Sequence, residues 1–275
     1  MIFQILGPLQ VAERVLTTSP VRRALLTAFL LRTGQSIGIG ELAQLLWDDP
    51  PCSAAANIRS HLTGLRRDLD RASRGLSGRL ETYRGSQTSY SLRVAAQECD
   101  LSTFTLTARR GRELLVGGQP EPAMADLERA VAMWRGPFGQ DLPATRWFGA
   151  HVAGLNDARI NAYQDLFTAC VLANRTEMLS YRIEAVLAEA PYRQRLWELL
   201  ATVHTINGDA AGALAVIRRC QDLFADDLGL DLPPNLEAMR GAALSWNRGQ
   251  ALELLLAAAT GDATGGGRNG SPALL

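Results

Sequence analysis

The sequence contains no lysine, so all 28 of its basic residues are arginines. Any contact with a phosphate group must therefore come from arginine, a hydroxyl or a backbone amide. The few cysteines stand far apart, with no Cys-x-x-Cys pair and no histidine at a spacing typical of zinc sites. They are Cys52, Cys99, Cys170 and Cys220. We expect reduced, mostly buried thiols, no metal site and no bound cofactor.

Long apolar runs are also missing. None approaches the roughly 20 residues that cross a membrane. The N-terminal stretch MIFQILGPLQV lacks the charged start of a signal peptide and reaches Gly7 and Pro8 early. We therefore expect a cytoplasmic protein with no membrane partner. Catalytic groupings are absent as well, because His151 and His204 stand singly and no serine or cysteine has a base nearby, so we expect no enzyme.

The formal net charge of zero conceals an asymmetry. Residues 1–95 carry 12 arginines and seven acidic residues, a net charge of +5, and the remainder carries 16 arginines and 21 acidic residues, a net charge of −5. Any surface that binds a polyanion is therefore expected in the first third of the chain. At 275 residues, 47% of them hydrophobic, the chain is long enough for two domains with substantial cores.

The first half of the N-terminal region predicts a sheet and two helices. Three short β-prone runs predict a small antiparallel sheet: residues 2–6, 9–11 and 15–16. Ser19 and Pro20 favour a helix start, with a capping hydroxyl before proline, and Gly34 ends that helix. A second helix is expected from about Gly40 to Trp47.

The most informative stretch is residues 53–71, SAAANIRSHLTGLRRDLDR, which follows two prolines. At about 100° per residue, Ile58 and the leucines fall on one face, which predicts a helix with a core side. The opposite face holds small, polar and basic residues: Ala56, Arg59, Ser60, Thr63 and Arg67. We expect the Ser53 hydroxyl to accept a hydrogen bond from a free amide of the first turn. Taken alone, such a basic face is more often solvated than bound to DNA.

Two strands, residues 80–83 and 89–94, are expected to form a hairpin with Arg84 near its tip. A sheet, three helices and a hairpin, in that order, predict a winged helix-turn-helix domain over residues 1–96. In this fold the third helix enters the major groove and the hairpin, called the wing, reaches the backbone or the minor groove beside it.

The rest of the chain predicts one helix after another. The expected helices are residues 101–115, 120–134, 147–173, 176–189, 193–207, 210–226 and 234–248. Paired helices of this length suggest an all-α, tetratricopeptide-like repeat domain over residues 97–248, with Gly208 and Asp209 at the most repeat-like turn. Residues 249–275 are expected to hold the end of a helix and, from about Gly261, a disordered tail. The predicted fold is thus mainly α with a small β part.

Five stretches resemble the Streptomyces antibiotic regulatory protein family, in which an OmpR-type DNA-binding domain precedes a bacterial transcriptional activation domain. They are ILGPL (residues 5–9), LAQLLWDDPP (42–51), NIRSHLTGLRRDL (57–69), AVAMWRGPFGQDL (130–142) and the segment 195–244. They run in the family's order and cover about residues 1–246. The family usually has a polar cap where this chain has Gly40, and a Pro-Gly-Tyr turn where Ser89 precedes Tyr90. Longer relatives append a nucleotide-binding module; nothing after residue 246 resembles one, so we expect no ATP-dependent regulation.

The DNA-contacting residues are expected on and around the third helix. Base contacts are expected from Arg59, Ser60, Thr63 and Arg67. Each bidentate arginine–guanine pair contributes roughly 1–3 kcal/mol of discrimination. Phosphate contacts are expected from Arg22, Arg23, His61, Arg66 and Arg84.

Structural alternatives stand beside several of these roles. Arg66 can instead pair with Asp70 four residues on, and His61 can be a packed histidine. Arg22 and Arg23 can be a solvated helix start, and Trp134 to Pro137 are interpreted as an aromatic plug that ends a helix.

The sequence predicts a sequence-specific transcriptional activator that binds double-stranded DNA. The family resemblance implies binding as two copies to promoter direct repeats, recruitment of RNA polymerase, and control of a gene cluster for a secondary metabolite such as an antibiotic. Such a protein would associate with the nucleoid. The alternative is a helical-repeat interaction scaffold with a vestigial winged helix.

Overall fold

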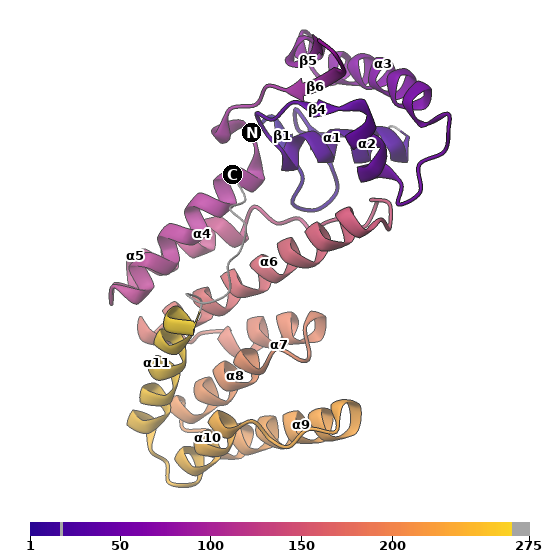
Figure 1. Cartoon of the computed structure of the whole chain (residues 1–275). Coiled ribbons are helices and arrows are strands. Elements are labelled where there is room, and N and C mark those ends of the chain that lie inside the picture. Colours follow the sequence, from indigo (N-terminus) through magenta and orange to yellow (C-terminus); the bar gives the residue numbers. More distant parts are fainter. Residues whose placement is uncertain (17–18, 266–275) are drawn as a thin grey trace. The chain divides into compact units, whose positions relative to one another are not determined.

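The computed structural model describes residues 1–16 and 19–265, and it groups them into two compact units. Unit 1 comprises residues 1–106 and 132–159; unit 2 comprises residues 107–131 and those from 160 onward. Helices dominate both units, and two small sheets lie in unit 1 (Figure 1). The predicted fold class, a winged helix-turn-helix followed by a helical-repeat domain, is confirmed.

Unit 1 opens with the predicted antiparallel sheet. Its strands pair in the order β1 (Phe3–Gln4), β2 (Gln10–Val11) and β3 (Arg14–Val15). Phe3, Ile5 and Leu6 are buried, so the first of the β-prone runs that predicted the sheet also anchors it to the core.

The three predicted helices follow as α1 (Pro20–Leu31), α2 (Ile39–Leu46) and α3 (Ala54–Ala72). Proline begins α1 as expected, but neither Ser19 nor Ser53 caps its helix with its hydroxyl, so that prediction is wrong. At Ser53 the reason is the backbone. Its φ of −82° and ψ of −2° are helical, whereas a capping residue is usually extended, and its Oγ instead accepts a hydrogen bond from Asn57 Nδ2 at 3.3 Å.

The hairpin belongs to a three-stranded sheet. Strands β5 (Leu80–Arg84) and β6 (Thr88–Leu92) form the expected antiparallel pair, and the sheet order is β4-β6-β5. The additional strand β4 (Ile37–Gly38) pairs with Tyr90 and Ser89 of β6. Two residues are too few to show a strand periodicity, so β4 was not predicted. Short 3-10 helices at Leu76–Arg79 and Ala96–Glu98 flank β5 and β6.

Residues 132–159 pack with unit 1 although the chain reaches them after two further helices. The backbone amide of Arg135 donates to Leu6 O at 2.9 Å, and its guanidinium donates to Pro8 O at 2.7 Å. Thr145 Oγ1 donates to Leu45 O at 2.9 Å in a buried contact. The domain boundary expected after residue 96 remains a prediction. In the structure, residues 97–106 and 132–159 pack with residues 1–96 as one compact unit.

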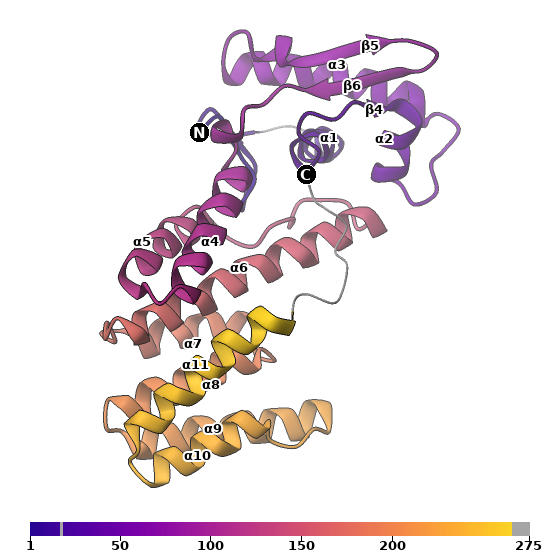
Figure 2. The ribbon, with the colours of Figure 1, turned by 60° about the vertical axis from the view of Figure 1, so that its left-hand side comes forward.

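Unit 2 is a stack of helices. The long helices α4 (Asp100–Val116) and α6 (Arg146–Leu172) begin in unit 1 and end in unit 2. The others are α5 (Pro120–Val131), α7 (Leu179–Glu189), α8 (Gln194–Ile206), α9 (Ala210–Leu228), α10 (Pro234–Leu244) and α11 (Arg248–Gly265). Helix α8 is central, since it packs against α7, α9, α10 and α11 (Figures 1 and 2). At the repeat-like turn, Gly208 has a φ of +80° and Asp209 caps α9 by accepting from the Gly212 amide at 2.8 Å.

The C-terminal region corrects one expectation. A separate helix, α11, occupies residues 248–265, where the sequence analysis placed a helix end and, from Gly261, a tail. Ala251 and Leu255 are buried, and α11 packs against α8 and α10, so tertiary contacts hold the helix that residue pattern alone did not reveal. The remainder of the predicted tail, residues 266–275, lies outside the described residues.

Candidate nucleic-acid interface

Helix α3 presents one buried and one exposed face. Ile58, Leu62, Leu65 and Leu69 are at most 1% exposed and fix the rotation of the helix in unit 1. The four predicted base-contacting residues therefore face outward, and all four are exposed: Arg59, Ser60, Thr63 and Arg67. The core-facing leucines and the outward arginines are thus set by the same helical period.

The two arginines on this face are available for an external ligand. Among the residues described, neither Arg59 nor Arg67 has a side chain hydrogen bond or ion pair. Thr63 differs, because its hydroxyl donates to Arg59 O at 3.0 Å. Its single proton is used within the helix, so toward a base Thr63 can offer its methyl group or accept a hydrogen bond, but it cannot donate one to a phosphate.

One edge of α3 is fastened to α1. Arg22 Nη1 lies 2.9 Å from Asp68 Oδ2, and Asp68 is almost completely buried. The Arg22 guanidinium passes directly over Gly64, where an added Cβ would lie 2.5 Å from Arg22 Cζ. Arg22, expected at phosphate, thus holds two helices of the domain together, and a phosphate contact would be made in addition to that role.

His61 lies half-buried on the same side of α3. Burial lowers the pKa of His61 below its ordinary value, and the nearby charge of Arg22 lowers it further. Its imidazole is therefore mainly neutral near pH 7. A neutral ring can still donate one hydrogen bond to a phosphate, although the contact strengthens when the ring is protonated.

The opposite edge of α3 is fastened to the hairpin. Arg66 Nη2 donates to Leu80 O at 2.9 Å and to Thr82 Oγ1 at 2.8 Å, both on β5. The alternative pairing of Arg66 with Asp70 is wrong. Asp70 instead accepts from the amides of Gly75 and Ser77, at 3.1 and 3.0 Å, and the hydrogen bond from Ser77 lowers its pKa.

The hairpin carries Arg84 at the end of β5, exposed and directly before the turn of residues 85–87. Figure 2 shows β5 and β6 running beside α3. The lack of the family's Pro-Gly-Tyr turn does not prevent the hairpin: Ser89 pairs with Tyr83 and Gly38, and Tyr90 is buried. Arg84 therefore lies on a regular wing next to the α3 face.

Arg23 occupies a different environment. It is half-buried and its Nε lies 3.8 Å from Asp141, so it faces the segment 132–159. The structure thus brings Arg59, Ser60, Thr63 and Arg67 together on one face and places His61, Arg66 and Arg84 around it. Arg23 is turned toward another part of unit 1.

Sequence reasoning missed the residues that position this face. Gly64 and Asp68 receive Arg22, and Thr82 receives Arg66. Two signals were present in the sequence: a glycine in the middle of a helix, where it costs about 1 kcal/mol relative to alanine, and an acidic residue beside the apolar face. Each indicates a close approach or a buried partner.

Other chemistries find little support in the part of the chain that the structure describes. It contains no cluster of three or more histidine, cysteine, aspartate or glutamate side chains that could hold a metal ion. Cys52 is exposed and the other three cysteines are buried, with no disulfide among them. No described helix is long and apolar enough to cross a membrane.

The three helices and the hairpin of unit 1 define the class of winged helix-turn-helix proteins, and the comparisons give the family. The family model "Bacterial transcriptional activator domain" matches residues 99–244. EmbR of Mycobacterium tuberculosis, a transcriptional regulatory protein, is 30% identical over 241 residues, which cover 86% of this chain and 61% of that protein. The chain thus spans about three-fifths of the length of that relative.

Two further relatives are regulatory proteins of Streptomyces. AfsR of Streptomyces coelicolor is 32% identical over 86% of this chain and 24% of its own length. DnrI of Streptomyces peucetius is 23% identical over 89% of this chain and 92% of its own length. A solved structure of Mycobacterium tuberculosis EmbR in complex with a low affinity phosphopeptide superposes with a TM-score of 0.82 at 28% identity, covering 95% of this chain and 69% of that one.

The chain belongs to the family defined by the bacterial transcriptional activator domain and is a member of the Streptomyces antibiotic regulatory protein family of transcriptional regulators. The resemblance read from the sequence is confirmed.

Proposed function

We propose that this chain is a sequence-specific DNA-binding transcriptional activator that works in the cytoplasm on the nucleoid. The observation that carries the proposal is the exposed face of α3, where Arg59 and Arg67 have no side chain partner among the described residues. An arginine that is neither paired nor buried retains the forked donor geometry that reads guanine in the major groove. The excess of five positive charges over residues 1–95 supports the approach of this part of the chain to DNA.

The contacts divide by chemistry. We propose that Arg59 and Arg67 read guanine, that Ser60 contacts a neighbouring base edge, and that Thr63 presents its methyl group to thymine. His61 and Arg84 would contact phosphates. Arg23, also expected at phosphate, lies 3.8 Å from Asp141 and would chiefly pair within unit 1. Arg22 and Arg66 would contribute chiefly by holding α3 against α1 and the wing, with any phosphate contact made by the N–H groups that those bonds leave over.

The family supports a further part of the proposal. Two copies of the chain would bind direct repeats near a promoter, recruit RNA polymerase, and activate genes for a secondary metabolite. The relatives named as regulatory proteins of Streptomyces support this role. Residues 99–244, which match the activator-domain model and include parts of both units, are the part proposed to contact polymerase and the second copy.

The test is binding to DNA fragments from the promoters next to the gene, measured by fluorescence anisotropy against unrelated DNA. Arg59→Ala and Arg67→Ala should each weaken binding to the specific site by about 10- to 100-fold and reduce its preference over unrelated DNA. The matched control is Arg109→Ala, because Arg109 lies on α4, is 78% exposed and pairs with Glu113 on the same helix. Unchanged affinity and unchanged sequence preference in both α3 variants would contradict the assignment of Arg59 and Arg67 as base contacts.

Salt dependence separates this function from an interaction scaffold. With about five phosphate contacts, log affinity should fall with log salt concentration at a slope of about −4 to −5. A scaffold would form no specific DNA complex to titrate. Removal of Arg84 alone should reduce the magnitude of the slope by about one while leaving sequence preference in place.

A further inference from the structure

Unit 2 contains a polar cavity of about 600 Å³ that the DNA-binding role does not use. Its walls come from α4, α6 and the connection between α7 and α8. The volume lies within the roughly 300–1,000 Å³ that is usual for small-molecule sites. Such a cavity can take a metabolite but is too small for a folded partner.

Arginines outnumber acidic residues in the lining, and two of the arginines, Arg112 and Arg195, also pair with Asp165 and Glu198. Three arginines line the cavity, Arg112, Arg193 and Arg195, against one acidic residue, Asp165. Arg112 Nη1 bonds Asp165 Oδ1 at 2.7 Å, and the Arg112 side chain remains 40% exposed. This geometry orients the Arg112 guanidinium and still leaves part of its N–H fork accessible.

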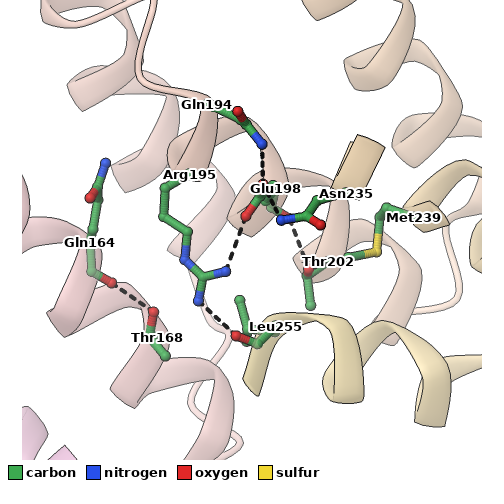
Figure 3. Close-up of polar contacts among 9 residues, drawn as sticks. All are labelled: Gln164, Thr168, Gln194, Arg195, Glu198, Thr202, Asn235, Met239 and Leu255. Atoms are coloured by element: carbon green, nitrogen blue, oxygen red, sulfur yellow. Dashed lines mark hydrogen bonds and ion pairs between the residues drawn. The ribbon is translucent and has the colours of Figure 1, made fainter. Parts of the chain in front are cut away.

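Arg195 is held in place by hydrogen bonds to Glu198 and Leu255. It is only 12% exposed, and its guanidinium donates to Glu198 Oε2 at 3.1 Å and to Leu255 O at 2.8 Å (Figure 3). Glu198 in turn accepts from Gln194 at 2.7 Å and from Asn235 at 3.2 Å. The buried carboxylate thus accepts hydrogen bonds from Gln194 and Asn235 as well as from Arg195, and this network fixes its position.

The third wall of the cavity is also fixed. Trp197 Nε1 donates to Pro191 O at 2.8 Å, and Tyr192 OH donates to Asp227 Oδ2 at 2.9 Å. These bonds tie two adjacent residues of the α7–α8 connection, Pro191 and Tyr192, to α8 and α9. A site whose walls are held before a ligand arrives loses less entropy on binding.

The remaining lining is suited to hydroxyl and amide groups. Asn161 and Gln164 each offer a side chain carbonyl and an amide, and Gln194, whose amide donates one hydrogen to Glu198, offers its carbonyl and its second N–H. Thr168 uses its proton on Gln164 O at 2.8 Å, which leaves its oxygen as an acceptor (Figure 3). The cavity therefore combines fixed cations with neutral groups that both donate and accept.

We propose that this cavity binds a small polar organic anion, with a carboxylate or phosphate on the arginines and hydroxyl or amide groups on Asn161, Gln164 and Gln194. The ligand would act as an effector of the helical unit, because its anionic group would meet Arg195, whose other bonds reach α11 through Leu255. This inference does not depend on DNA binding.

Isothermal titration calorimetry of the full chain without DNA tests the site. The probes are citrate for carboxylates, 3-phosphoglycerate for a phosphate with a carboxylate and a hydroxyl, and inorganic phosphate, all at matched ionic strength. We expect saturable binding of citrate or 3-phosphoglycerate, and weaker binding of inorganic phosphate, which lacks groups for the amides. Arg112→Gln should weaken that binding about tenfold, the loss of one charge-assisted hydrogen bond.

Arg109→Gln is the matched control, since Arg109 lies on the same helix, is 78% exposed and does not line the cavity. It should leave affinity within about twofold of the parent. Gln164→Ala provides a second variant that removes no charge, and it should weaken 3-phosphoglycerate more than inorganic phosphate. No saturable heat with any probe up to about 10 mM would overturn the proposal, as would equal losses in Arg112→Gln and Arg109→Gln.

Discussion

Gly64 shows how one missing side chain positions the α3 face. The Arg22 guanidinium crosses the helix at this glycine to reach buried Asp68. We predict that Gly64→Ala lowers the free energy of unfolding by about 1 kcal/mol, because displacing Arg22 from Asp68 costs more than the roughly 1 kcal/mol that alanine returns as helix propensity. Urea unfolding of the two chains measures the difference.

A double-mutant cycle isolates the cause of that loss. In an Arg22→Ala background the obstruction at position 64 is gone, so Gly64→Ala should there become stabilising by up to about 1 kcal/mol. The same effect of Gly64→Ala in both backgrounds would show that Arg22 and Gly64 do not interact energetically.

His61 makes a prediction about pH. Burial, followed by the charge of Arg22, lowers the folded-state pKa of His61 below the ordinary 6.5. At a pH between the two pKa values, His61 is therefore mainly protonated in the unfolded chain and mainly neutral in the folded chain. Stability from neutral His61 is complete above about pH 6.5 and is lost as the pH falls below it. The difference in free energy of unfolding between the parent and His61→Gln should therefore shift against the parent between about pH 7 and pH 5.

DNA binding should show the opposite dependence if His61 meets a phosphate. The phosphate charge favours the protonated ring, so the parent should gain affinity relative to His61→Gln as the pH falls. Parallel pH profiles of the two chains, measured by anisotropy at constant salt, would argue against the contact.

At the scale of elements, adjacent arginines of α3 serve different elements. Arg66 joins the helix to β5, whereas Arg67 faces outward. We predict that Arg66→Ala loosens the wing, with faster amide hydrogen exchange over β5 and β6 and a loss of about 1 kcal/mol of stability. Arg67→Ala, its matched control, should leave exchange unchanged and weaken specific DNA binding.

The elements that could be predicted from sequence are those with a strong local signal. The period of α3 separated its core residues from its outward arginines, and the β-prone runs around Gly7 located the first sheet. Strand β4 was not predicted because two residues carry no period. Helix α11 was not predicted because contacts with α8 and α10 stabilise it. The partners of Arg22 and Arg66 could not be predicted either, because each lies at least 14 residues away in the sequence and only the folded chain brings them together.

At the scale of the whole molecule, unit 1 is assembled from two separate parts of the chain. Asp100 is 1% exposed and accepts the amides of Ile5 and Leu6 at 2.8 and 3.0 Å, and Arg135 lies 3.3 Å from the same carboxylate. Arg135, from residues 132–159, thus pairs with the Asp100 carboxylate of α4 that accepts the amides of Ile5 and Leu6. A fragment that ends at residue 96 would lack both Asp100 and Arg135.

We predict that Arg135→Ala in the full chain destabilises unit 1 by about 2 kcal/mol, less than the roughly 3–5 kcal/mol for breaking a fully buried pair because the Arg135 side chain is 25% exposed. Asp100 keeps its two amide donors, so the loss should be local. Faster hydrogen exchange at Ile5 and Leu6, measured by mass spectrometry, is the expected result, with Arg109→Ala unchanged. Equal exchange in the parent and Arg135→Ala would mean that residues 132–159 lie against the rest of unit 1 without stabilising it.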